Sequence, residues 1–328
     1  FHLSAFAKNM ELALAIDLGG TTTKIALADP AGKIHRRTSI STADQKDEHT
    51  FFRSLFFAMS ELMNREAGEF HLAGIGAGAP SVNEREGTIE NAANLPFSAK
   101  VEFVKTVKDQ FGLPAFLVKD TNASTLGELT YGAAQGMKNF ILLTLGTGLG
   151  GGIVSDGNLL GGEHGHGGEA GHVCVEPTGR ACGCGRRGCL ETYVSATGLK
   201  RTVFELIANT LTSSRLRSLN FEAMSAKAIF EAARQGDRLA VEAFNFTGKI
   251  LGRALADMAA WFDPEAIFLA GGLASAGDLL FQPTIESLEN HCLAFHKGKI
   301  KVLPSALGEN DSALLGAASL VWNIRRAE

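Results

Sequence analysis

Two stretches, LALAIDLGGTTTKIALADPAGKI over residues 12–34 and FILLTLGTGLGGGIVSDGNLL over residues 140–160, share one layout and decide the fold. Each predicts a strand, a glycine-rich turn, a second strand and a further turn at Pro-Ala-Gly or Asp-Gly. In a Walker loop or a dinucleotide fingerprint the glycines open a helix, whereas here short apolar runs, IALAD and GGIVSD, follow them. We therefore expect two β-hairpins in a duplicated α/β domain with a cleft between the copies, each hairpin presenting backbone N–H groups to a phosphate chain.

Length, composition and charge are those of a large globular protein. The chain has 328 residues, 45% of them hydrophobic, which is enough for a sizeable core and for two domains. The net charge of −4 comes from mixed acids and bases, so there is neither a basic stripe for nucleic acid nor an acidic tail. No apolar run could span a bilayer, and the opening FHLSAFAKN lacks the features of a secretion signal. We expect a cytoplasmic protein that binds neither nucleic acid nor membranes.

A glycine-rich stretch over residues 162–191, GEHGHGGEAGHVCVEPTGRACGCGRRGCLE, sets one histidine ahead of a compact group of cysteines. One imidazole and three thiolates form a common ligand set for structural zinc, and the intervening glycines allow the backbone to fold around one ion. Buried thiols or disulfides are the alternative, but Cys182 and Cys184 are too close to pair comfortably and five cysteines is an odd number. We expect a Zn²⁺ site with the ligands His172, Cys182, Cys184 and Cys189.

The first hairpin carries charged residues beside its glycines. Gly19 and Gly20 let the backbone approach phosphate, the following threonines can donate hydrogen bonds, and Lys24 adds a positive charge. Asp17 would repel phosphate without a cation between them, so the motif indicates Mg²⁺ held partly through water. The alternative is a glycine-rich turn with an incidental acid.

Two further glycine motifs fit a nucleotide. LGTGLGGG, residues 145–152, is the turn of the second hairpin, and pairing it with the first strengthens the phosphate-binding interpretation of both. AGGLASAGD begins at Ala270 after an expected buried strand, and its paired glycines would let a purine or ribose lie against bare backbone. A plain strand-to-helix turn explains this second motif equally well.

Three carboxylates are candidates for work on a substrate. Asp120 follows the expected strand PAFLVK and could accept a proton from a substrate hydroxyl, although an acid that stabilises the dipole of the next helix is the alternative. Asn122 is expected to cap that helix. Glu169 and Glu191 flank the cysteine group and could accept hydrogen bonds from vicinal sugar hydroxyls; the alternative is exposed loop acids.

Together these motifs resemble the ROK family (repressors, open reading frames, kinases), and within it the bacterial glucokinase-like sugar kinases. The resemblance covers almost the whole chain from Met10 and rests on DLGGTTTK, GAGAPSV with NAANLPF, KDTNASTLGE, LGTGLGGG, GGEAGHV with CGCGRRGCLE, and FLAGGLASAGD. The pairing of ExGH with CxCGxxGCxE is its most specific part. The resemblance implies an actin-like (ribonuclease H-like) two-domain ATPase fold, ATP with Mg²⁺, phosphorylation of a hexose at its 6-hydroxyl, and a homodimer.

The resemblance also implies a role for each matching residue. Asp120 would be the catalytic base, and the sugar pocket would be lined by Asn94, Glu169, His172 and Glu191, with His172 also binding zinc. The nucleotide and its metal would be served by Asp17, Gly19, Gly20, Thr21, Lys24, Gly146, Thr147, Gly148, Gly271 and Gly272. The expected N-terminal lobe covers residues 10–130 with the closing helix 308–328, and the C-terminal lobe covers residues 131–307.

Two departures from the family pattern leave the choice of hexose open. Lys119 stands where members often carry Asn or Thr, and Ser81 stands at a position that varies among members. Glucose is the expected substrate, with N-acetylmannosamine, N-acetylglucosamine, fructose, mannose or allose as alternatives. Family repressors carry a winged helix-turn-helix before the DxGGT segment, and Asp17 lies close to the start here, so a repressor-derived protein is a less favoured alternative. A non-catalytic sugar sensor is also less favoured, because Asp120 and both glycine loops are intact.

Overall fold

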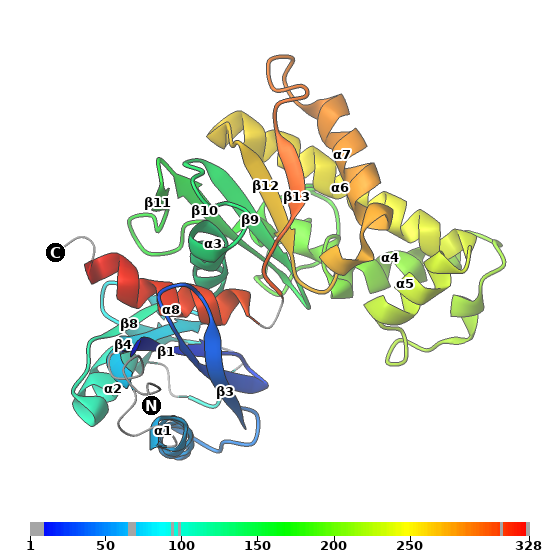
Figure 1. The fold of residues 1–328 in the computed structure, drawn as a ribbon. Helices are drawn as coiled ribbons and strands as arrows, with labels where there is room; N and C mark the ends of the chain where they lie inside the picture. The colour runs from blue at the N-terminus through cyan, green and yellow to red at the C-terminus, as the bar shows by residue number, and fades with distance from the viewer. Residues whose placement is uncertain (1–9, 65–69, 93–94, 98–99, 309–310, 326–328) are drawn as a thin grey trace, which may run out of the picture. The chain divides into compact units, whose positions relative to one another are not determined.

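The structure, a computed structural model, describes residues 10–64, 70–92, 95–97, 100–308 and 311–325. The chain divides into two compact units (Figure 1). Unit 1 consists of Phe1–Gly136, Gly161–Gly167 and Ala306–Glu328, and unit 2 of Met137–Leu160 and Gly168–Ser305. Gly161–Gly167 therefore packs with unit 1 although its neighbours in sequence belong to unit 2.

Unit 1 is built on a five-stranded mixed sheet in the order β3-β2-β1-β4-β8. The first three strands form an antiparallel meander, whereas β4 and β8 run parallel to β1. The strands are β1 (Met10–Leu18), β2 (Thr22–Ala28), β3 (Ile34–Ser41), β4 (Phe70–Ala79) and β8 (Ala115–Lys119). A small antiparallel sheet follows β4 and consists of β5 (Val82–Asn83), β6 (Thr88–Glu90) and β7 (Lys100–Val101).

The alternation of large and small residues in β1 decides what packs on each face of this sheet. Leu12, Leu14 and Ile16 belong to a large core with phenylalanines of α1 (Glu48–Asn64) and α2 (Phe103–Phe111). Ala13 and Ala15 face the other way, against α8 (Ser312–Arg325). Since side chains alternate between faces along a strand, small residues on one face let the helix backbone come very close to the sheet.

Helix α8 packs equally closely on α3 (Asp120–Tyr131). A Cβ built on Gly316 would lie 1.6 Å from the backbone oxygen of Ala123, so only glycine fits there. Near the end of α3, the fully buried carboxylate of Glu128 accepts hydrogen bonds from the N–H groups of Ala133 (2.8 Å) and Ala306 (3.0 Å). One buried acid therefore joins the C-terminal end of α3 to the segment that leads into α8.

Unit 2 repeats the strand plan of unit 1. Its sheet has the order β11-β10-β9-β12-β13. Strand β10 is antiparallel to both of its neighbours, β9 and β11, whereas β12 and β13 run parallel to β9. The strands are β9 (Phe140–Leu145), β10 (Leu149–Ser155), β11 (Asn158–Leu159), β12 (Ala266–Ala270) and β13 (Lys301–Pro304). The predicted duplicated α/β architecture, with a glycine turn joining two strands in each copy, is confirmed.

Helices cover the sheet of unit 2, and two of them, α6 and α7, make the most extensive helix pair of the unit. Helix α6 begins where the Asp237 side chain accepts N–H bonds from Leu239 and Ala240. It ends with Asp263 as its C-cap, followed by Pro264, which cannot continue a helix. The helices are α4 (Ala196–Asn209), α5 (Ala226–Arg234), α6 (Arg238–Phe262) and α7 (Asp278–His291). Four short 3₁₀ helices are η1 (Ala170–His172), η2 (Leu190–Thr192), η3 (Arg215–Ser218) and η4 (Ala274–Ala276).

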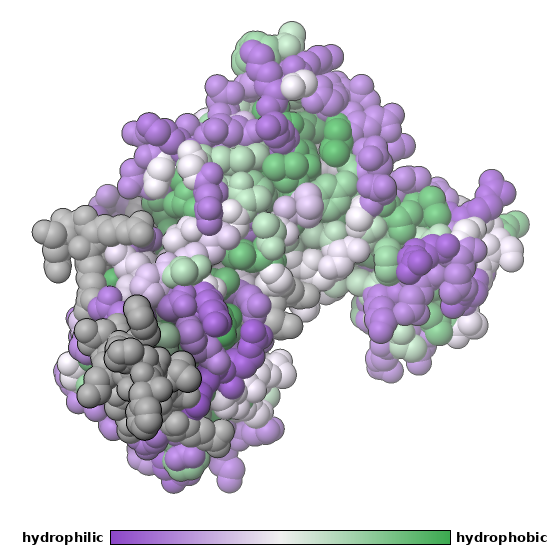
Figure 2. All heavy atoms as spheres, in the orientation of Figure 1, coloured by the Kyte–Doolittle hydropathy of each residue, from purple (hydrophilic) through white to green (hydrophobic). Residues whose placement is uncertain are grey.

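The surface is mixed, and hydrophobic residues reach it over the α6–α7 part of unit 2 (Figure 2). Large apolar side chains exposed in this part are Phe246, Trp261, Phe262, Leu293 and Phe295. Within the described part of the chain, every helix is too short or too polar to cross a membrane.

Candidate active site

The first glycine hairpin joins β1 to β2 and holds an acid against a lysine. Asp17 is the register partner of Lys24, and Lys24 Nζ lies 3.6 Å from Asp17 Oδ2. The turn is closed by a hydrogen bond from Gly19 N–H to the oxygen of Thr22 (3.2 Å). Burial raises the pKa of Asp17, and the nearby Lys24 ammonium opposes that rise. A bound divalent cation would offset the same burial cost, so this pair suits a metal-bridged phosphate.

The second hairpin joins β9 to β10 and contacts the other predicted nucleotide motif. Gly146 N–H donates to the oxygen of Gly148 (3.0 Å) in the hairpin turn. Gly271 has φ +86°, and a Cβ there would lie within 3.0 Å of the Leu145 backbone, while Leu273 N–H donates to Leu145 O (3.0 Å). Only glycine combines this left-handed conformation with so close an approach. The structure thus brings the end of β9, directly before the Gly146–Gly148 turn, against the Gly271–Gly272 turn.

Asp120 is the first residue of α3 and directly follows β8. It lies at the same end of the sheet as the carboxyl end of β1. The register sets Asp17 of β1 level with Gly78 of β4 and with Val118 of β8. Asp17 and the end of β8 are therefore two strand spacings apart, roughly 10 Å. The Asp120 carboxylate accepts the N–H of Thr121 (2.7 Å). Both acids lie at the carboxyl ends of parallel strands, where functional side chains gather in α/β sheets.

The expectation that Asn122 caps α3 is wrong. The helix begins at Asp120, immediately after the strand, so the N-cap position falls on Lys119 and Asn122 lies inside the first turn. Asn122 is 1% exposed, and its amide nitrogen donates to Glu84 Oε1 (2.9 Å). Its Oδ1 and the Thr121 hydroxyl are buried without a hydrogen-bond partner among the described residues. Unsatisfied buried polar atoms are uncommon, and here they are next to a candidate catalytic residue.

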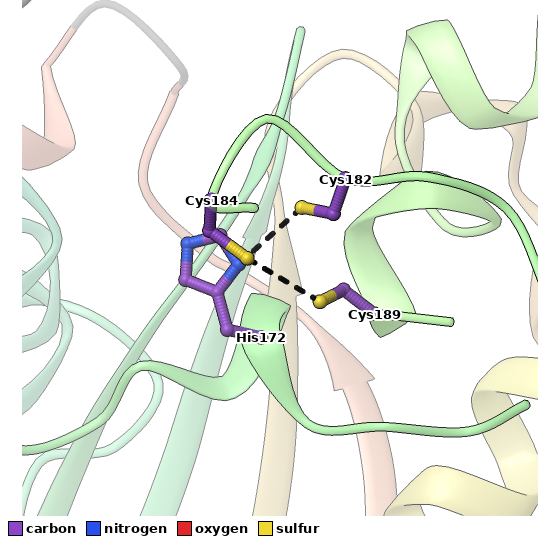
Figure 3. Close-up of side chains that lie close together, drawn as sticks. All are labelled: His172, Cys182, Cys184 and Cys189. Atoms are coloured by element: carbon purple, nitrogen blue, oxygen red, sulfur yellow. Dashed lines mark hydrogen bonds between the residues drawn. The ribbon is translucent and has the colours of Figure 1, made fainter. Parts of the chain in front are cut away.

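The four predicted metal ligands converge in unit 2 (Figure 3). Their ligand atoms all lie within 4.8 Å of one another, with Cys184 Sγ 3.6 Å from Cys189 Sγ and Cys182 Sγ 3.7 Å from His172 Nδ1. A tetrahedral zinc ion with Zn–S bonds of about 2.3 Å separates its sulfurs by about 3.8 Å, so these separations fit one shared ion. Burial raises the pKa of Cys189 to about 12, so a cation is needed to hold this thiol as a thiolate.

The loop that carries these ligands contains a turn that requires glycine, and Arg180 makes several of its bonds to the neighbouring elements. Gly188 has φ +71°, and a Cβ there would lie 1.7 Å from the oxygen of Glu176, so the final turn requires glycine. The nearly buried Arg180 guanidinium donates to the oxygens of Thr192 (2.7 Å) and Gly198 (3.1 Å) and forms an ion pair with Glu205. Arg180 therefore attaches the metal loop to α4, a role that the sequence motifs did not indicate.

Glu191 connects the metal loop to the second glycine hairpin. Its Oε2 accepts the N–H of Leu149 (3.0 Å), and a Cβ on Gly148 would lie 2.4 Å from the same oxygen. Its other oxygen is 4.0 Å from Cys182 Sγ. Glu169, in contrast, is exposed and precedes η1, where its backbone oxygen accepts the N–H of His172 (3.1 Å).

The predicted residues thus fall into two groups. Unit 1 holds Asp17, Gly19, Gly20, Thr21, Lys24 and Asp120, and unit 2 holds the second hairpin, the Gly271–Gly272 turn, the metal ligands, Glu169 and Glu191. Asn94 lies outside the described residues. Glu84 was missed, because an acid in a turn of GAGAPSVNEREG carries no signal that it will contact the start of α3.

Comparison with known proteins agrees with these motifs. The ROK family model matches residues 13–324. The chain belongs to the ROK family. The resemblance inferred from its sequence motifs, and with it the actin-like two-domain fold, is confirmed.

ROK proteins with assigned activities cover the chain almost completely. Glucokinase from Thermotoga maritima is 36% identical, over 94% of this chain and 96% of the relative. N-acetylmannosamine kinase from Citrobacter koseri is 30% identical, over 94% of this chain and 97% of the relative. Among solved structures, a ROK family glucokinase from Streptomyces griseus, in complex with glucose and AMPPNP, matches with a TM-score of 0.78 and 31% identity, over 95% of this chain and 99% of that one.

Proposed function

We propose that this ROK protein is an ATP-dependent sugar kinase that transfers the γ-phosphoryl group to the 6-hydroxyl of a hexose, with glucose as the first substrate to test. The observation that carries the proposal is the arrangement of residues at the carboxyl ends of the parallel strands in the unit 1 sheet. There Asp17, paired with Lys24, and Asp120 stand at the ends of β1 and β8, beside a turn built from glycine. Phosphoryl transfer needs such a combination of groups that position charge and a group that orients the attacking hydroxyl.

Asp120 is the proposed base. As a carboxylate at a strand end it would accept the proton of the sugar hydroxyl and align its oxygen for in-line attack on the γ-phosphorus. The N–H groups of Gly19, Gly20 and Thr21 and the Lys24 ammonium would donate to phosphate oxygens and offset charge as it develops. These are contributions from unit 1 alone.

Unit 2 would supply further nucleotide and sugar contacts. The contact between the second hairpin and the Gly271–Gly272 turn supports a shared site for phosphate and nucleoside, because both present backbone with few side chains. Glu169, His172 and Glu191, with Asn94 from the first lobe, are proposed to bind sugar hydroxyls. Carboxylates and imidazole suit this task since they accept or donate hydrogen bonds in fixed directions.

Two metal ions are proposed. Asp17 would hold Mg²⁺ on the nucleotide, supported by the burial that raises its pKa, and Mg²⁺ would neutralise phosphate charge. Zn²⁺ would be held by His172, Cys182, Cys184 and Cys189, supported by ligand separations near those of a tetrahedral site. The zinc would act structurally, because four protein ligands leave no open position.

A coupled ADP-release assay tests the activity and identifies the sugar. Glucose, N-acetylmannosamine, N-acetylglucosamine, fructose, mannose and allose are compared at equal ATP and Mg²⁺ concentrations. We expect the highest kcat/KM with glucose. ADP release that no sugar stimulates would contradict the kinase proposal, and a higher kcat/KM with another hexose would change only the substrate.

The homodimer implied by the family resemblance is also a proposal. It is supported by the exposed apolar side chains of the α6–α7 part, among them Trp261, which is 81% exposed. Sedimentation velocity over a range of concentrations would show a dimer, and a monomer at all concentrations would contradict it. A cytoplasmic location stays a proposal as well.

A further inference from the structure

Glu84 reaches the start of α3 from a different element, the turn between β5 and β6. Its Oε1 accepts two hydrogen bonds, from the backbone N–H of Lys119 (3.3 Å) and from the side-chain amide of Asn122 (2.9 Å). These two donors stand on either side of Asp120 in the sequence. One carboxylate oxygen therefore links the last residue of β8 to the first turn of α3.

Lys119 occupies the N-cap position of α3 and its side chain does not cap the helix, while the Asp120 carboxylate accepts only the neighbouring Thr121 N–H among the hydrogen bonds described above. A helix begins with unpaired N–H groups, which are normally satisfied by a Ser, Thr, Asp or Asn at that position. Glu84 supplies an acceptor from outside the helix instead. A carboxylate is well suited to this place, because the N-terminal end of a helix carries partial positive charge.

The same contact fixes the orientation of Asn122. An amide whose nitrogen donates to a carboxylate cannot be reversed without placing its oxygen against a negative charge. The Asn122 amide is therefore held with Nδ2 toward Glu84, and Oδ1 stays buried without a partner in the described chain. A buried acceptor left unsatisfied is unfavourable, so the hydrogen bond to the Glu84 carboxylate decides the orientation of this amide.

Glu84 belongs to a hydrogen-bonded turn. Asn83 precedes it, and the oxygen of Asn83 accepts the N–H of Gly87 (2.9 Å), which adopts φ +68°. The Asn83 side chain donates to Glu90 across the strand pair (3.3 Å). On its other side, the segment Gly161–Gly167 lies against this turn through an ion pair between Glu163 and Arg85. Glu84 is thus presented from a turn that hydrogen bonds on both strands close.

We propose that Glu84 is a positioning residue that holds Asp120 in the orientation needed to accept the proton of the sugar hydroxyl. The proposal rests on the role of Asp120 in the proposed kinase reaction. Glu84 acts through the turn that carries Asp120 and does not itself meet the sugar. Misplacing a catalytic group by about 1 Å can lower a rate about 100-fold, so the loss of two hydrogen bonds at this turn has a large effect on kcat.

The main test is Glu84→Ala with Glu84→Gln as the conservative variant. Glu84→Ala is expected to lower kcat about 10- to 100-fold with little change in the KM for ATP. Glu84→Gln keeps an acceptor oxygen and is expected to retain kcat within about threefold. Glu86→Ala is the matched control, an exposed acid of the same turn whose carboxylate pairs with Lys100. Melting temperatures identify any variant whose loss of activity is merely a loss of folded protein.

A double-mutant cycle separates this proposal from the role of Asp120 itself. If Glu84 acts through Asp120, adding Glu84→Ala to Asp120→Asn lowers the residual kcat hardly at all. An equal loss in both backgrounds, or a Glu84→Ala enzyme with wild-type kcat, would overturn the positioning role while leaving the kinase proposal intact. An Asp120→Asn enzyme with wild-type kcat would instead refute the base assignment on which the proposal rests.

Discussion

The two units share one strand plan but differ in the hairpin that carries the glycines. In unit 1 the last register pair but one before the hairpin turn is Asp17 with Lys24, whereas in unit 2 the corresponding pair is Thr144 with Gly150. The first hairpin carries its own charges, and the second receives one from the metal loop through Glu191. The comparison teaches that the two copies share the backbone plan of the hairpin, and that the charged groups beside each hairpin come from different parts of the chain.

The largest expected effect tests whether unit 1 alone holds the base. Asp120→Asn removes the proton acceptor and is expected to lower kcat about 10²- to 10⁴-fold, the usual contribution of a general base. Sugar binding is expected to remain, because the amide still forms hydrogen bonds. Steady-state kinetics measures the first effect and isothermal titration with the sugar the second. Turnover close to that of wild type would show that another residue is the base.

The metal loop of unit 2 has no counterpart in the described part of unit 1, so its ligands should matter for stability. Cys184→Ser is expected to lose the metal and to destabilise unit 2 by more than about 4 kcal/mol, the range reached when a structural metal is lost. Elemental analysis and thermal melts measure both effects. Cys174→Ser is the control, since this exposed cysteine lies outside the cluster. Wild-type protein purified without chelator and free of zinc would contradict the assignment.

Substitutions at two glycines of the second hairpin distinguish a glycine needed for packing within the protein from one needed for the approach of a ligand. Gly148→Ala would push a methyl group against Glu191 and is expected to cost about 1–3 kcal/mol of stability. A Cβ on Gly146 would meet no atom of the described residues within 4 Å, so Gly146→Ala should leave the melting temperature nearly unchanged. A raised KM for ATP in Gly146→Ala would then report a clash with the nucleotide. Equal melting temperatures for the two variants would contradict the contact with Glu191.

The charge on the first hairpin predicts a pH effect. Burial raises the pKa of Asp17 and Lys24 opposes the rise, so Lys24→Met should raise that pKa further. Asp17 must be ionised to hold a cation, so the acidic limb of the kcat/KM profile for ATP is expected to move to higher pH. An unchanged limb would mean that Asp17 does not control it.

The smallest expected effect concerns Glu265, which precedes β12 in unit 2. Its carboxylate accepts the N–H groups of Asn139 (3.0 Å) and Lys138 (2.8 Å), and these bonds lower its pKa below the ordinary value of 4.5. Its contribution to stability is thus full above the ordinary pKa and is lost as the pH falls through the lowered one. Glu265→Gln should be slightly less stable than wild type at pH 7, and the difference should vanish in acid. Urea unfolding at several pH values measures the difference, and a difference that persists in acid would contradict the assignment.

The sequence motifs predicted the fold better than they predicted the surroundings of the site. Hairpins, the duplicated sheet and the four ligands could be inferred because glycine turns, strand alternation and cysteine spacing act over a few residues. Glu84, Arg180 and the interior position of Asn122 could not, since each depends on contacts between elements far apart in the chain. Lys119 and Asp120 were expected at a strand end, but that the helix starts at once is a matter of tertiary packing.

The contact of Glu128 with Ala306 has a consequence for the order in which the protein is made. The first strands of unit 1 precede unit 2 in the chain, yet the partner of this buried acid and the helix that covers Ala13 and Ala15 follow it. All the residues of unit 2 have left the ribosome once Ser305 has emerged, whereas the part of unit 1 that starts at Ala306 has not yet emerged. A nascent chain stalled before Ala306 would therefore contain all of unit 2, while the alanine face of the unit 1 sheet would lack the helix that covers it. Such a chain exposes apolar surface that a chaperone could bind.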